Sequence, residues 1–186
     1  VEVLQKIGTP EAALIALTFL RDLNPIVRLQ VVKRAKPEVD LVAKALLWSG
    51  VNDSSEAVRA WCLAGLLNAG PPSMKKEALE LIKQETVGTL DRAVRLIQDE
   101  TVLTELLRSE HAVVRAACYE RVEQLSVKLS PLIADLAVKE LDLFVLRTLA
   151  ASKLDLPKEL VTRLSESKDP ALIAIRARIQ PKTARL

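Results

Sequence analysis

NPIVRLQVVKRA (residues 24–35) is the stretch that decides the fold, because altered copies of it recur along the chain. SEAVRAWCLAGL begins at Ser55, and HAVVRAACYERV begins at His111. Each copy opens with a polar residue of the kind that starts helices, and each has a Val-Arg pair at its fourth and fifth positions. Self-similarity of this kind predicts an array of related helical units.

The arginines of the three copies set the period of the array. Arg28 and Arg59 are 31 residues apart, whereas Arg59 and Arg115 are 56 apart, which is two steps of 28. The same period places further members near residues 87, 143 and 172, where the arginine has been replaced. The repeat therefore continues beyond the copies that keep its signature.

Proline and capping residues mark where the helices begin. Thr9, Asn24, Ser130 and Asp169 each precede a proline, which is tolerated at the first position of a helix. No segment alternates between apolar and polar residues with a period of two, so we predict no strands and an all-α fold. The predicted helices cover residues 10–22, 25–36, 38–49, 55–68, 73–86, 90–98, 100–108, 112–125, 131–138, 140–152, 157–166 and 170–179.

These helices are short, and isolated helices below about 12 to 15 residues are marginal in water. Stacking against neighbouring repeats must therefore supply their stability. We expect a single domain over residues 1–186, built as an α-solenoid of about six stacked helical hairpins. Residues 177–186 are expected to form a basic C-terminal tail.

The repeat pattern resembles a known family. A leucine-rich helix, a polar turn and then the pattern xVRxxAxxxL resemble the HEAT-like repeat, in particular its short form of about 30 residues in phycobilin-lyase-type proteins. Residues 14–36, 41–69 and 103–125 carry the resemblance well, whereas 73–100 and 131–152 carry it poorly. The resemblance implies a HEAT/armadillo-like superhelix and says little about function, because such folds serve many functions.

The repeated residues have structural explanations. Val27 and Val31 stand four residues apart on one helix face, and Cys62 and Cys118 occupy the position of Val31 in their own copies. We expect this face to form the core and both cysteines to be buried. Arg28, Arg59 and Arg115 lie four residues after a capping-region residue, where a guanidinium can bond across the turn or to the next repeat. We expect these three to form a structural ladder, as the resemblance to HEAT-like families also implies.

The remaining candidates for chemistry are isolated. His111 is the only histidine and stands at a predicted helix start, where a capping role on the surface is expected. Trp48 and Trp61 fall on consecutive predicted helices, and we expect them to pack between these helices rather than to form a base-stacking surface. Two cysteines in different repeats indicate neither a disulfide framework nor a metal site.

Composition and motifs exclude several classes of function. Residues 171–186 contribute +4 to a net charge of +3, so the rest of the chain sums to −1, which is weak support for a polyanionic partner. No phosphate-binding loop, metalloprotease motif or nucleophile elbow is present, so we expect a protein that is not an enzyme and needs no cofactor or metal. The apolar runs are too short to span a membrane, and we expect a cytoplasmic, reducing location.

The first functional hypothesis is a scaffold that binds a protein through a concave face lined by the second helices of the hairpins. The exposed candidates on that row form a mixed-charge set, which favours a protein partner over a polyanion. They are Gln30, Lys33, Arg34, Tyr119, Glu120 and Glu123.

Two alternatives remain open. A nucleic-acid-binding protein with the architecture of the HEAT-like DNA glycosylases would use Lys33, Arg34 and the three ladder arginines as contacts. A phycobilin-lyase-like accessory role rests on the length of the repeat alone. Apolar residues in the end segments 1–8 and 171–179 are also compatible with a subunit or fragment of a larger assembly.

Overall fold

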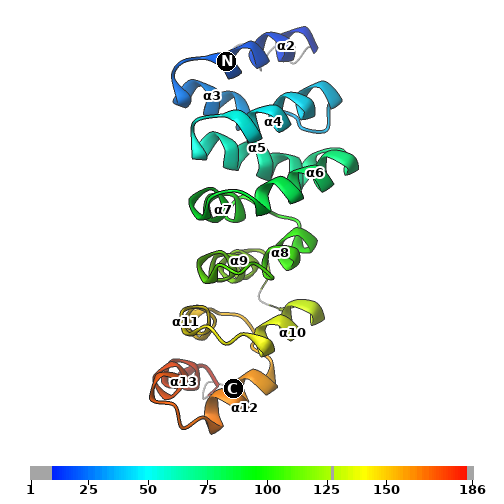
Figure 1. The fold of residues 1–186 in the computed structure, drawn as a ribbon. Coiled ribbons are helices and arrows are strands. Elements are labelled where there is room, and N and C mark those ends of the chain that lie inside the picture. Colours follow the sequence, from blue (N-terminus) through cyan, green and yellow to red (C-terminus); the bar gives the residue numbers. More distant parts are fainter. Residues whose placement is uncertain (1–9, 127, 184–186) are drawn as a thin grey trace. The chain divides into compact units, whose positions relative to one another are not determined.

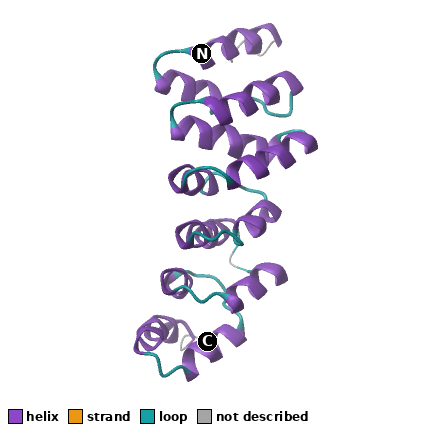
Figure 2. Cartoon of the chain, viewed as in Figure 1, coloured by secondary structure: helices purple, strands orange, loops and turns teal. Residues whose placement is uncertain are grey.

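A computed structural model describes residues 10–126 and 128–183. Within these residues all regular structure is helical, as Figures 1 and 2 show, and the predicted all-α class is confirmed. The predicted cap at Thr9 lies outside the described residues. The helices are α2 (Pro10–Thr18), the 3-10 helix η1 (Phe19–Arg21), α3 (Pro25–Val32), α4 (Asp40–Asn52), α5 (Glu56–Ala69), α6 (Pro72–Lys83), α7 (Val87–Val94), α8 (Glu100–Leu106), α9 (Ala112–Leu125), α10 (Pro131–Lys139), α11 (Leu143–Ala151), α12 (Lys158–Glu166) and α13 (Pro170–Thr183).

The chain divides into two compact units, Val1–Val102 (unit 1) and Leu103–Leu186 (unit 2). The division falls within α8. Within the described residues helices alternate along the chain between a first and a second member of a pair, from α2 and α3 to α12 and α13. We call these pairs hairpins one to six.

Each unit has two layers of helices. In unit 1 the second helices α3, α5 and α7 contact one another in order, and the first helices α4 and α6 do the same. In unit 2 the second helices α9, α11 and α13 form the corresponding row, and α10 contacts α12 (Figure 1). Within each unit, therefore, first helices pack on first helices and second helices pack on second helices of the next hairpin.

The core of unit 1 is centred on α5, which lies between α3 and α7 and also packs on α4 and α6. Val58, Cys62 and Leu66 are fully buried, as their spacing predicts. Gly50 allows α4 to approach α5 closely, because a β-carbon there would lie 2.9 Å from Leu63 Cδ2. A larger residue at this position requires Leu63 to move.

The core of unit 2 repeats the pattern in α9 and α11. Val114 and Cys118 are completely buried, and Val145 and Leu149 hold the equivalent positions in α11. Both cysteines of the chain are free and buried, which confirms their predicted role as small core residues.

The C-terminal segment differs from the predicted tail. Helix α13 continues to Thr183, so the segment expected as a tail from residue 177 begins inside a helix. Arg176 in this helix donates from Nη1 to the carbonyl oxygen of Ser165 at 2.7 Å, which ties α13 to α12. Pro181 did not end the helix where the sequence suggested an end near residue 179.

No helix in the described part of the chain combines the length and the apolar character needed to span a bilayer.

Candidate functional site: the arginine ladder and the second-helix face

A common hydrogen bond aligns the second helices of all six hairpins. The residue before each helix accepts, at its carbonyl oxygen, the amide proton of the fourth helical residue. This bond defines a fourth position in every second helix. The repeat positions that we predicted near residues 87 and 143 lie three residues later in the structure. The fourth positions are Arg28, Arg59, Leu90, Arg115, Leu146 and Ile173.

Arg28 joins the first hairpin to the second. Its Nε and Nη2 donate to the two carboxylate oxygens of Asp53 at 2.7 and 2.8 Å, in a bidentate pair. Its Nη1 donates back across its own turn to the carbonyl oxygens of Asp22 and Leu23, at 2.7 and 3.2 Å. One guanidinium thus satisfies two orphan carbonyls and one carboxylate.

Arg59 repeats this arrangement with the third hairpin. Its Nε and Nη2 lie 3.0 and 3.2 Å from the carboxylate oxygens of Glu85, and its Nη1 donates to the carbonyl oxygen of Asp53 at 2.9 Å. Thr89 accepts a further bond from Nη2 at 3.3 Å. The acceptor is again the turn of the next hairpin, 26 residues later in the sequence.

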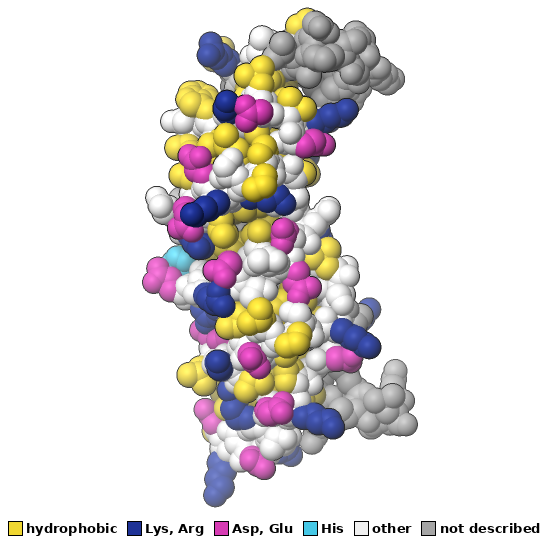
Figure 3. Space-filling model, turned by 90° about the vertical axis from the view of Figure 1, so that its right-hand side faces the viewer, with side chains coloured by type: hydrophobic (Ala, Val, Ile, Leu, Met, Phe, Trp, Pro, Cys, Tyr) yellow, Lys and Arg dark blue, Asp and Glu magenta, His cyan; other side chains and the backbone are white. Residues whose placement is uncertain are grey.

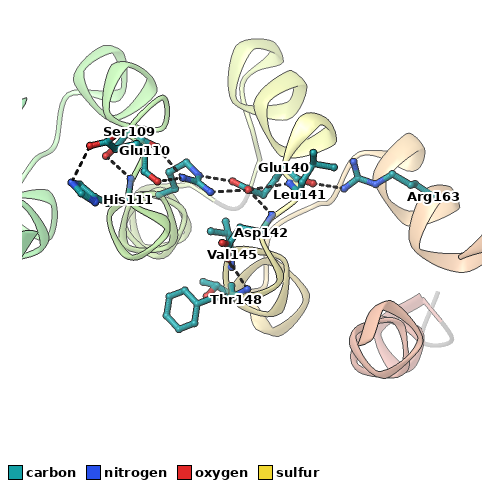
Figure 4. Close-up of polar contacts among 11 residues, drawn as sticks. Ser109, Glu110, His111, Glu140, Leu141, Asp142, Val145, Thr148 and Arg163 are labelled. Atoms are coloured by element: carbon teal, nitrogen blue, oxygen red, sulfur yellow. Dashed lines mark hydrogen bonds and ion pairs between the residues drawn. The ribbon is translucent and has the colours of Figure 1, made fainter. Parts of the chain in front are cut away.

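Arg115 makes the same contacts in unit 2, and Figure 4 labels the acceptor residues Ser109, Glu110 and Glu140. It donates from Nε and Nη2 to Glu140 at 2.8 and 3.0 Å, and from Nη1 to the carbonyl oxygens of Ser109 and Glu110 at 2.9 and 3.0 Å. Arg163 reaches the carbonyl oxygen of Glu140 at 2.7 Å from the other side. The turn around Glu140, just before α11, is therefore bonded to both α9 and α12 of unit 2.

These pairs are largely withdrawn from solvent. The side chains of Arg28 and Asp53 are 10% and 5% exposed, and those of Arg115 and Glu140 are 17% and 7% exposed. Burial works to raise the pKa of Asp53, but hydrogen bonds from Arg28 and from the Ser55 amide outweigh it and hold the pKa below its ordinary value. The pairs are therefore ionised at neutral pH.

The pKa of Glu140 is lowered in the same way. Burial opposes ionisation, whereas hydrogen bonds from Arg115 and from the amides of Asp142 and Leu141 favour it and prevail. The hydrogen bond to Glu140 raises the pKa of Arg115, as the bond to Asp53 raises that of Arg28. The hydrogen bonds of the Arg28–Asp53 and Arg115–Glu140 pairs thus stabilise the charged form of both partners.

The turn residues that accept the arginines occupy equivalent positions in their hairpins, a regularity that we did not predict from the sequence. In every hairpin a polar side chain in the turn, one or two residues before the capping residue, accepts the amide proton of that capping residue. This side chain is an acid after each arginine and a serine after Leu90 and Leu146. The six residues are Asp22, Asp53, Glu85, Ser109, Glu140 and Ser167. The paired change was visible in the sequence as an acid 25 or 26 residues after each arginine.

A second set of contacts joins the other ends of the second helices to later turns. Asn68, near the end of α5, accepts the amide proton of Gln98 at 2.8 Å and donates to the carbonyl oxygen of Leu96 at 2.9 Å. Glu123, near the end of α9, accepts the amide proton of Lys153 at 2.8 Å, also 30 residues later. Glu123, expected to contact a partner, thus caps the turn that follows α11.

Three of the expected partner-binding residues lie in unit 1 and three in unit 2. Lys33 and Arg34 are exposed at the end of α3, and Gln30 is half-buried there and accepts from Arg34. In unit 2, Glu120 and Glu123 are half-buried. The structure therefore groups the cationic candidates in one unit and the acidic ones in the other.

Tyr119 is not on the surface, contrary to the expectation. It is 1% exposed, and burial, reinforced by Glu140, raises its pKa. Helix α9 buries a wide arc that runs from Ala116 to Tyr119, because its neighbours cover more than its core face. Tyr119 is a core residue of unit 2.

Trp61 is a surface residue of the second-helix face that the predicted set omitted. It stands on α5, half-buried, with the Lys33 ammonium 5.0 Å from its ring centroid. Gly65, one turn later on the same helix, has open space where a β-carbon would stand. Arg92 on the neighbouring helix α7 is exposed and, like Trp61 in α5, lies two residues after the fourth position. Their shared position in the repeat is the sequence signal that could have identified Trp61 and Arg92 as surface residues.

Trp48 differs from the expectation that both tryptophans pack between helices. Its side chain is 61% exposed on α4, on the same helical face as Leu41 and Val51, which are 53% and 49% exposed. In Figure 3 hydrophobic side chains lie among charged ones on the face that is shown. The two tryptophans of unit 1 therefore stand on different helices with different surroundings.

The other candidates do not form a reactive site. Burial raises the pKa of Cys118 to about 12 and also raises the pKa of Cys62. His111 precedes α9 in the capping position, but its side chain makes no cap and lies 3.7 Å from Glu110. The described residues hold no cluster of three potential metal ligands.

Comparison of the chain with protein-family models, with curated proteins and with solved structures finds no match. Functional conclusions therefore depend on the geometry of the chain itself.

Proposed function

We propose that this protein is an α-solenoid of the HEAT-like type that acts without catalysis and binds a protein partner through the face of its second helices. The observation that supports this most directly is the group formed by Lys33, Arg34 and Trp61 in unit 1, with the Lys33 ammonium over the Trp61 ring. Repeat proteins commonly bind partners along the row formed by equivalent helices.

The chemistry of this group indicates the kind of partner. Lys33, Arg34 and Arg92 are exposed cations, and Trp61 provides apolar area beside Lys33. Tryptophan and arginine are the residues that most often dominate the binding energy of protein interfaces. An acidic protein segment with at least one apolar side chain matches this surface.

The ladder arginines are not part of this surface. Arg28, Arg59 and Arg115 have their guanidinium groups committed to carboxylates and carbonyls of the turns. Moving these guanidinium groups to a partner would leave buried acceptors without a hydrogen bond, which would lower the stability of the fold. Contact with a partner therefore falls to the residues that differ between repeats.

Site-specific photo-crosslinking in the native source tests the proposal. A crosslinking amino acid replaces Lys33 in one variant and Lys44 in the control, because Lys44 is similarly exposed but lies on the first helix α4. We expect protein adducts of defined mass at position 33 and few at position 44. Equal yields at both positions, or none at position 33, contradict the proposal.

Nucleic-acid binding is the second candidate, and one observation favours it. A cation stacked on a tryptophan, with further cations at Arg34 and Arg92, is also a surface on which bases stack. A titration of single-stranded DNA across salt concentrations separates the two: an affinity that falls steeply with salt supports nucleic acid. Absence of binding at low salt removes this candidate.

A further inference from the structure

The first hairpin of unit 1 carries an acid, Asp22, whose carboxylate forms no ion pair with a cation of the described residues, although Arg28 of the same hairpin donates from Nη1 to the Asp22 carbonyl oxygen and favours its charge at longer range. Asp22 accepts the amide proton of its capping residue Asn24 at 2.8 Å, as Asp53 accepts that of Ser55 at 2.8 Å. Asp53 also holds a guanidinium from the preceding hairpin. No lysine or arginine among the described residues forms an ion pair with Asp22.

The identity of this residue matters because a serine performs the capping role equally well. Ser109 and Ser167 accept the capping amides of their hairpins, and both follow hairpins whose fourth position is leucine. An acid occurs at this position where the preceding hairpin supplies an arginine, as at Asp53 and Glu140. Asp22 is therefore the type of residue that, at this position, binds an arginine of a preceding hairpin.

The apolar surface of α3 is also incompletely covered. Val58 and Ala60, on either side of Arg59, are 0% exposed because α5 lies between α3 and α7. Val27 and Leu29 hold the same positions around Arg28 but are only half-buried. Helix α3 is covered on the side of α5, and no other second helix of the described residues packs on its other side.

We propose that this end of unit 1, formed by Asp22 and the half-buried face of α3, docks a further helical hairpin whose second helix carries an arginine at its fourth position. The guanidinium of that hairpin binds the Asp22 carboxylate as Arg28 binds Asp53. Its second helix covers Val27 and Leu29. The proposal rests on the contacts between hairpins and not on the partner-binding function.

A second copy of this chain stacked head to tail does not meet the requirement. The fourth position of its last hairpin is Ile173, which is 44% exposed. An apolar residue at that position is followed elsewhere in the chain by serine, as Leu146 is by Ser167. The occupant is therefore an arginine-bearing hairpin other than α12–α13.

An extended chain provides the test. Residues 40–62, which contain α4 and the arginine at position 59, are fused directly ahead of Val1 of the full chain. Gly8 then lies 11 residues after the copied arginine, the separation between Arg59 and Gly70 in the natural sequence. Folding equilibria are measured by urea denaturation for the natural and the extended chains, with Asp22 or with Asp22→Ser.

We expect Asp22→Ser to weaken the folding equilibrium of the extended chain by at least about tenfold, because it leaves a guanidinium unpaired. In the natural chain the same substitution is expected to change the equilibrium by less than about threefold. Asp22→Glu is expected to retain the stability of the extended chain, since glutamate serves as the acceptor at Glu85 and Glu140.

Two matched controls make the outcome decisive. When the copied arginine is changed to leucine, Asp22→Ser is expected to lose its effect in the extended chain. An equal effect of Asp22→Ser in both chains overturns the proposal. The proposal is also overturned if the extended chain folds with leucine in place of the copied arginine and serine at position 22, but fails to fold with the copied arginine and Asp22.

Discussion

Within the two units, two kinds of junction connect successive second helices. After α3, α5 and α9 an arginine that is largely withdrawn from solvent binds an acid in the next turn, whereas after α11 the fourth position is leucine and the next turn carries serine. The sequence repeats the leucine and serine pattern at Leu90 and Ser109. The serine keeps the bond to the capping amide and removes the charge. The comparison teaches that arginine and acid change together, because a buried charge without its partner costs more than the pair gains.

Placing an arginine in a leucine junction is expected to have the largest effect. Leu146 is 2% exposed, so Leu146→Arg buries a charge that faces Ser167 in place of an acid and destabilises unit 2 by about 4 kcal/mol. Adding Ser167→Glu is expected to recover about half of this loss. Urea denaturation followed by far-ultraviolet circular dichroism measures both losses; no recovery in the double variant contradicts the rule.

Removing the charge of one acid in an arginine junction comes next. Asp53→Asn leaves Arg28 buried with a neutral neighbour and is expected to cost about 3 kcal/mol. Both tryptophans lie in unit 1, so the denaturation curve from tryptophan fluorescence reports on this unit. Asp40→Asn is the control, because Asp40 pairs with Lys44 on the surface and should cost less than about 0.5 kcal/mol. Similar losses for the two variants would show that burial of the pair is unimportant.

Acid should weaken the arginine junctions selectively. The pKa values of Asp53 and Glu140 are lowered in the folded chain, so the unfolded chain binds protons first as the pH falls. The stabilisation is fully present above the ordinary carboxyl pKa, about pH 5 and higher, and is lost as the pH falls through the lowered values. Denaturation midpoints between pH 6 and pH 3 measure the loss, and Asp53→Asn is expected to flatten the pH dependence of unit 1.

The smallest expected effect concerns the surface rather than the junctions. Lys33→Ala removes a cation from the Trp61 ring and is expected to cost about 0.5 kcal/mol of stability in unit 1. Trp48→Phe leaves Trp61 as the single tryptophan, and the emission of this variant with and without Lys33→Ala reports the contact directly. A loss as large as that of Asp53→Asn would place Lys33 among the structural residues.

The sequence predicted the helices well because local signals control them. Proline, capping residues and apolar spacing placed a helix at each of the twelve α-helices of the described residues, and the repeat indicated that Cys62 and Cys118 are buried. These features depend on neighbours within a few turns of the chain.

The exposure of single side chains was harder to predict, because it depends on how far each helix is rotated toward its neighbours. Tyr119 follows the core residue Cys118 and was expected outside, but the buried arc of α9 includes both. Trp48 was expected inside and lies on an outer face of α4. Periodicity identifies the centre of a buried face and not its width.

A double-mutant cycle at Arg115 and Glu140 tests the central claim most directly, because it converts an arginine junction into the leucine and serine type found elsewhere in the chain. The four proteins are the natural chain, Arg115→Leu, Glu140→Ser and the double variant, compared by their free energies of unfolding. We expect the double variant to be more stable than Glu140→Ser alone, with a coupling energy of at least about 1.5 kcal/mol. Additive losses, with a coupling energy near zero, would contradict the account.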